Sequence, residues 1–133
     1  SSCVKDPEMM TAYLDAFGPA SMLAITALWQ GAAVPMLKAY LDEDYARQYL
    51  WNQATAIAAF ESIDDATIEN ADTAAFLGAV IDLVEYLVEK EDDTHEGADL
   101  AAQHVLEAYA GVDYGVATMD DVEEWREWLA NWE

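Results

Sequence analysis

Acidic residues outnumber basic ones by more than five to one in this 133-residue chain. Asp and Glu together number 27 and Lys and Arg only 5, so the net charge is −22 with both His neutral. Most carboxylates therefore have no opposite charge within the chain, and a folded molecule must leave them in solvent. Such a surface cannot neutralise phosphates or anionic lipids. We expect no direct nucleic-acid binding, and the charge argues against a membrane surface as partner.

The same charge predicts a dependence on salt. High net charge is a recognised adaptation of halophilic proteins. A charge of −22 on a sphere of radius about 18 Å has a screened self-energy of roughly 17 kcal/mol at 0.15 M salt and roughly 5 kcal/mol at several molar. The difference, about 10 kcal/mol, rivals the stability of an ordinary domain. We therefore predict a protein of a halophilic microbe, such as an archaeon, or of its virus, with a salt-dependent fold and a surface layer of cations and water.

The spacing of the apolar residues predicts an all-α fold. Apolar side chains cover most of a helix circumference between Asp72 and Lys90, and Asp82, Glu85 and Glu89 remain as a polar stripe. Further helices are expected near residues 10–17, 19–40, 44–60 and 118–132, and one that starts at Thr94 or Ala98 and ends near Tyr109. No run alternates convincingly with the period of a strand. We predict one domain over residues 1–133, a bundle of five or six helices whose second and fourth helices are the most buried. Residues 1–7 are expected to fray.

The second predicted helix contains a long uncharged stretch. Residues 18–37 carry no charge and are just long enough to span a bilayer. Pro19, Gln30 and Pro35 argue against a membrane segment. We interpret the stretch as a core helix kinked by Pro35, or as two half-helices joined near Gly31.

Few residues offer site chemistry. The single cysteine, Cys3, excludes a disulfide-rich secreted scaffold and favours a cytoplasmic or virion-associated location. No nucleophile motif, phosphate loop or dinucleotide fingerprint occurs. His95 and Asp99 have the spacing of two zinc ligands on one helix face, and His104 with Glu107 forms a second pair, but a third ligand is missing. We therefore predict neither a metal nor a cofactor.

The last predicted helix, within residues 118–133, is amphipathic and rich in Trp. Its apolar residues follow the spacing of a heptad seam: Val122, Trp125, Leu129 and Trp132, widened by Trp128. Trp often dominates interface energies, so these five residues are candidate partner-binding residues. In the alternative interpretation, the helix folds back and its Trp side chains fill the bundle's own core.

These features favour a non-enzymatic structural, assembly or protein-interaction subunit that packs helices against itself or another protein. One alternative is a small helical enzyme or metal-binding bundle that uses the acidic stripe or the two His. Another is an acidic regulator or DNA mimic. A concave pocket converging on the stripe would favour an enzyme. Two rows of carboxylates would favour a mimic, and an exposed apolar patch would favour an assembly subunit.

Overall fold

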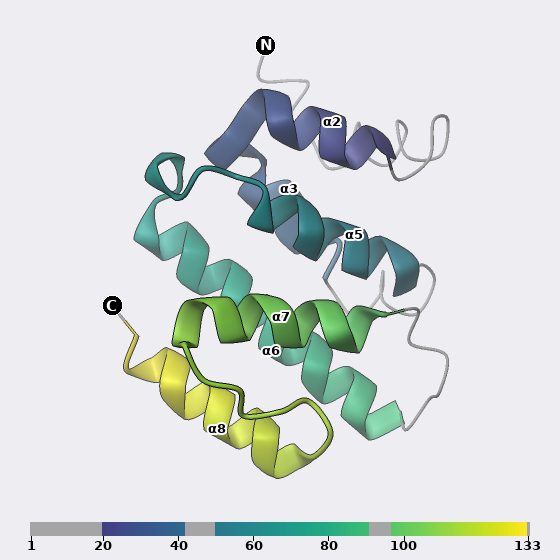
Figure 1. Cartoon of the computed structure of the whole chain (residues 1–133), viewed down its shortest axis with the longest axis vertical. Helices are drawn as coiled ribbons and strands as arrows, with labels where there is room; N and C mark the ends of the chain where they lie inside the picture. The colour runs from purple at the N-terminus through teal and green to yellow at the C-terminus, as the bar shows by residue number, and fades with distance from the viewer. Residues whose placement is uncertain (1–19, 42–49, 91–96, 133) are drawn as a thin grey trace.

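A computed structural model describes residues 20–41, 50–90 and 97–132, and the account below concerns these alone. All regular structure in them is helical (Figure 1). The α-helices are α2 (Ala20–Trp29), α3 (Val34–Ala39), α5 (Leu50–Glu61), α6 (Asn70–Lys90), α7 (Ala98–Ala110) and α8 (Met119–Ala130), and two short 3-10 helices are η2 (Gln30–Ala33) and η3 (Asp65–Thr67). The predicted all-α bundle is confirmed.

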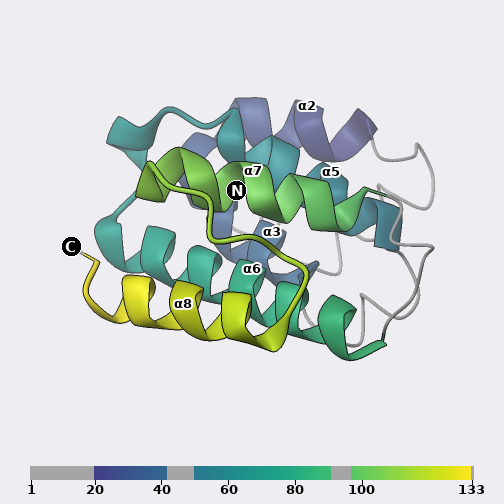
Figure 2. The ribbon, with the colours of Figure 1, turned by 60° about the horizontal axis from the view of Figure 1, so that its bottom comes forward.

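The longest helix, α6, organises the packing. It lies against α3, α7 and α8, while α5 lies against α2, α3 and α7. Helix α2 forms one end of the bundle and α8 the other, and α8 runs alongside α6 (Figures 1 and 2). The core joins α5 to α6 through Phe60 and Phe76, whose rings stack with their centroids 4.0 Å apart. This arrangement leaves the outer sides of α2 and α6 facing solvent.

Local sequence signals set the ends of the later helices. Gly111, with φ 75°, adopts the left-handed conformation that ends α7, because glycine takes this conformation at little cost. Helix α8 begins with a capping box in which Thr118 accepts from the backbone N–H of Asp121 and the Asp121 side chain accepts from that of Thr118. These boundaries agree with the expected helices.

The uncharged second segment is two α-helices separated by η2. Gln30 has a positive φ of 52°, which breaks the helix. Gly31 packs so tightly against the following connection that an added Cβ would lie 1.9 Å from the carbonyl oxygen of Thr67. The Gly31 N–H donates to Thr67 Oγ1 (3.1 Å), and the Asp64 N–H donates to Gln30 Oε1 (3.0 Å). Of the two interpretations, the pair of half-helices is correct, and Pro35 lies in the first turn of α3, where its missing N–H costs little.

The expectation that the second and fourth helices are the most buried is not confirmed. Helix α2 leaves Leu23 43% and Leu28 80% exposed. Helix α6 buries one side, but its other side carries exposed Ala75, Asp82 and Glu89. The polar stripe is thus only part of a wider solvent-facing surface on α6.

Candidate functional site

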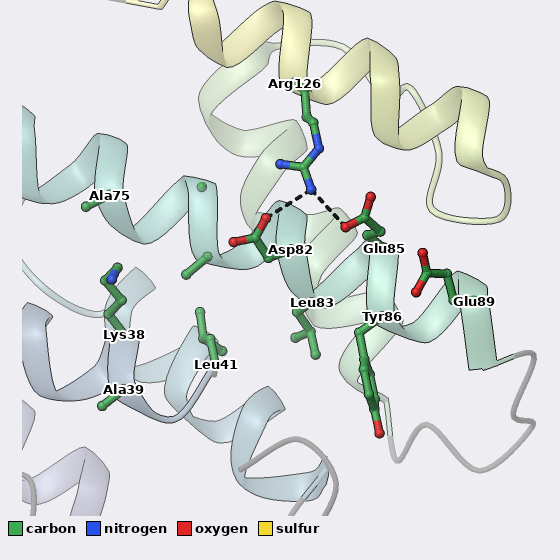
Figure 3. Close-up of a pocket in the computed structure, with 12 residues that line it drawn as sticks. Lys38, Ala39, Leu41, Ala75, Asp82, Leu83, Glu85, Tyr86, Glu89 and Arg126 are labelled. Carbon is green, nitrogen blue, oxygen red and sulfur yellow. Dashed lines mark hydrogen bonds and ion pairs between the residues drawn. The ribbon is translucent and has the colours of Figure 1, made fainter. Parts of the chain in front are cut away.

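A groove of about 580 Å³ runs between α3, α6 and α8 (Figure 3). Small residues of α6 form one part of it, Ala75, Gly78 and Ala79, and the acidic stripe continues along the same helix. Lys38, in the last turn of α3, lies on one side, and Arg126 of α8 lies on the other. The stripe that the sequence singled out therefore lines a concave surface.

Arg126 connects the acidic stripe to α8. Its Nη2 lies 2.9 Å from Asp82 Oδ1 and 3.2 Å from Glu85 Oε2. Asp82 and Glu85 are one helical turn apart, so a single guanidinium offsets the repulsion between two neighbouring carboxylates. All three side chains keep substantial solvent exposure, so each pair contributes at most about 1 kcal/mol. The ion pairs orient α8 on α6 more than they stabilise the fold.

The groove combines both signs of charge. Lys38 and Glu89 form no ion pair with a described residue. Tyr86 adds an aromatic ring, and Lys90 Nζ lies over it, 5.4 Å from the ring centroid. The described lining contains no Ser, Thr, Cys or His. Its carboxylates and Lys38 provide charges of both signs that can bind a small charged or zwitterionic molecule.

The candidate metal ligands are not brought together in the described part of the chain. His104 Nδ1 lies 2.6 Å from Glu61 Oε2 on α5, and its side chain is 72% exposed. His95 lies outside the described residues, and no group of three His, Cys, Asp or Glu within them could hold a metal ion. Asp99 and Glu107 lie on α7 with His104, and Glu107 is exposed.

One polar contact that the sequence did not indicate lies near the His104–Glu61 pair. The Tyr109 hydroxyl donates to Asp65 Oδ1 (3.1 Å). Burial, followed by this bond and the nearby carboxylates, raises the pKa of Tyr109 to about 12. The Tyr109 ring also contacts Phe60 and Trp132, at centroid distances of 6.0 and 6.3 Å. Tyr109 of α7 thus contacts both Phe60 of α5 and Trp132, which follows α8.

The five candidate partner-binding residues of α8 fall into two groups. Val122 and Trp125 are buried in the bundle's own core, and Trp125 Nε1 donates to the Gly115 carbonyl oxygen (2.7 Å). Trp128, Leu129 and Trp132 are only half-buried. Val122 and Trp125 therefore hold α8 against the bundle, and Trp128, Leu129 and Trp132 keep part of their surface exposed.

Helix α2 has an unusual distribution of polarity. Its outer side consists of exposed Leu23, Ala24, Ala27 and Leu28. On its inner side Met22 and Thr26 are fully buried, and the Thr26 hydroxyl makes no hydrogen bond to a described residue. The side chain of Gln53, on the adjoining α5, is likewise buried without a described hydrogen-bond partner. A surface helix ordinarily places polar residues in water and apolar residues inward.

Comparison with protein-family models, with curated proteins and with solved structures gives no match to this chain.

By length and composition, the stretch Ser21–Ala39 is apolar enough to cross a membrane. Core helices and signal sequences meet the same criteria, and 39% of the stretch is buried inside the bundle. Its continuity is broken at η2. On its own it is weak evidence for a membrane segment.

Proposed function

We propose that this chain is a non-enzymatic assembly or interaction domain of a halophilic microbe or its virus, working in the cytoplasm or the virion. It binds itself or another protein by helix packing in concentrated salt. The observation that carries this proposal is the outer side of α2, where Leu23 and Leu28 are 43% and 80% exposed on a helix without a single charge. Large contiguous apolar patches mark interaction sites on proteins, and the neighbouring Ala24 and Ala27 on the same side of α2 are exposed as well.

Salt bears on both folding and association. Ions screen the repulsion among the carboxylates of a chain with net charge −22. Salts that are excluded from protein surfaces also strengthen apolar contacts. A domain of this composition is therefore expected to fold and to associate under the same conditions.

The half-buried residues of α8 are a second candidate surface. Trp128 lines a shallow depression of about 330 Å³ together with Tyr114, Glu124, Glu127 and Asn131. A double change, Trp128→Ala with Trp132→Ala, separates the two roles of this helix. Loss of association with an unchanged melting temperature would favour partner binding, and a lower melting temperature with unchanged association would favour a purely structural role.

The groove on α6 favours a second candidate function, a binding or catalytic site for a small molecule. The supporting observation is that a concave surface converges on Asp82, Glu85 and Glu89, opposite Lys38. Titration with Mg²⁺ or glycine at constant ionic strength, followed by NMR of the backbone amides, tests this candidate. Shifts confined to α6 and abolished by Glu89→Gln would favour it, whereas no shift would count against it. The acidic regulator or DNA mimic remains a prediction without a supporting feature in the described residues.

The assembly proposal is tested by circular dichroism and light scattering between about 3 M and about 0.1 M KCl. We expect a folded oligomer at the upper end and loss of helicity at the lower end. A chain that is folded and monomeric throughout would overturn both the salt dependence and the assembly role.

A further inference from the structure

We propose that the outer face of α2 is the contact between two copies of this chain, with the two α2 helices antiparallel about a twofold axis. The α2 face means Leu23, Ala24, Ala27 and Leu28. This inference rests on the proposed assembly function and names its surface and its partner.

The first reason is that α2 is apolar on both sides, because its inner side buries Met22 and packs Ile25 and Trp29 against the core. Each residue of the α2 face is apolar and exposed, whereas Thr26, which is buried beneath, is polar and has no described hydrogen-bond partner. An isolated surface helix with this distribution is disfavoured, because water contacts its apolar side while its hydroxyl is desolvated. Covering the α2 face removes the first of these costs.

The second reason is the order of the residues, which fits a twofold axis. The segment from Leu23 to Leu28 reads Leu-Ala-Ile-Thr-Ala-Leu, so Leu and Ala on this face recur in the same order from either end. In a twofold contact, residue i of one copy meets residue j of the other, and j meets i. An antiparallel pair centred between Ile25 and Thr26 therefore sets Leu23 level with the second copy's Leu28, and Ala24 level with its Ala27.

The geometry of the face suits close packing. On the helix surface Ala24 and Ala27 fall between Leu23 and Leu28. Small side chains in the middle let two helix axes approach to about 8 Å, and the leucines then close over both flanks. Helix α2 forms one end of the bundle, so a second helix can lie along it (Figures 1 and 2).

The charge distribution allows a second copy to bind at the α2 face and disfavours a basic partner there. Two molecules of net charge −22 repel wherever carboxylates face one another, but residues 18–37 carry no charge. A basic partner would be drawn to the carboxylates and away from the α2 face. The α2 face of a second copy is uncharged and apolar as well, so two such faces can pack together without bringing carboxylates into contact.

The first experiment compares two exposed leucines in light scattering and sedimentation in about 3 M KCl. Leu28→Gln changes the α2 face, and Leu100→Gln changes a leucine of α7 that is 65% exposed. Both copies lose the contact in the Leu28 variant, so its dimer dissociation constant should rise at least about tenfold, whereas the Leu100 variant should match the parent. Circular dichroism verifies that both variants remain folded.

The second experiment tests the register by disulfide formation after Cys3→Ser. Ala24→Cys and Ala27→Cys are made in separate, differently sized chains, mixed and oxidised. With equal amounts of the two chains, the antiparallel pair predicts that the mixed disulfide exceeds its share from random pairing, because Ala24 is level with the second copy's Ala27. Preferred like-with-like disulfides would overturn the antiparallel arrangement. Ala75→Cys, an exposed alanine of α6, is the control for random collision.

The remaining outcomes separate this inference from the proposed function. If the dimer survives Leu28→Gln and forms no mixed disulfide, the α2 contact is wrong but the assembly role stands. A folded monomer overturns both. If the protein is a monomer and Leu28→Gln lowers its melting temperature, the α2 face makes a contact within the chain. If the monomer floats with neutral phosphatidylcholine vesicles, the α2 face binds a lipid surface.

Discussion

Trp125 is the side chain whose replacement tests the packing of α8 most directly. It is fully buried, its indole N–H donates to the Gly115 carbonyl oxygen (2.7 Å), and its ring meets Tyr114 edge to face with the centroids 4.8 Å apart. Trp125→Phe keeps an aromatic ring but removes the donor. The lost hydrogen bond costs about 1 kcal/mol, and the smaller buried area about 1–2 kcal/mol more. We expect a loss of about 2–3 kcal/mol, which lowers the melting temperature of a chain of this size by about 6–12 °C.

The assay is thermal unfolding followed by circular dichroism in concentrated KCl, where the fold is expected to be stable. Trp128→Phe is the matched control, because Trp128 lies on the same helix, is half-buried and makes no indole hydrogen bond to a described residue. Its expected loss is below about 1 kcal/mol. Equal losses for the two variants would refute the conclusion that Trp125 fixes α8 to the bundle through its buried N–H.

Three further predictions concern other contacts. Gly31→Ala should lower the melting temperature, at a cost of about 1–3 kcal/mol, because the new Cβ would meet the carbonyl of Thr67; Gly78→Ala, whose Cβ finds ordinary space inside a helix, should raise it slightly. Arg126→Gln should change the unfolding free energy by less than about 2 kcal/mol, as chemical denaturation would show, since each of its two ion pairs is solvent-exposed. Burial raises the pKa of Tyr109 to about 12, so its hydroxyl ionises more readily in the unfolded chain, and stability should fall as pH rises from 10 toward 12. Tyr109→Phe should lessen that fall, and an unchanged pH profile would contradict the assignment.

Local signals predicted much of the fold. The capping pair at Thr118 and the glycine after α7 act within a few residues of chain, and the structure has them where the sequence indicates. The break near Gly31 was one of two open interpretations. At this break Gly31 closely approaches Thr67, a residue 36 positions away, and no local pattern can show such a contact.

The site depends on contacts between distant segments, so less of it was predictable. The spacing of Asp82 and Glu85 indicated a shared helix face, but the sequence could not show that Arg126, 44 and 41 residues away, would bridge them. The heptad spacing in α8 likewise could not tell which Trp side chain is buried, because that depends on the neighbouring helices. The stretch from Leu23 to Leu28 is apolar nearly all round, so its sequence could not predict which side of α2 faces the core.

The range of electrostatic repulsion connects the predicted salt dependence to the proposed α2 contact. At 0.1 M salt repulsion extends about 10 Å, so carboxylates around an uncharged face still oppose a second copy. At several molar salt the range falls to a few ångströms, about the distance of direct contact. Carboxylates that touch one another still repel under these conditions, but those beside the α2 face no longer affect it. Concentrated salt therefore permits association at the uncharged face and leaves association elsewhere disfavoured, so the same −22 charge can require salt for folding and select the surface for pairing.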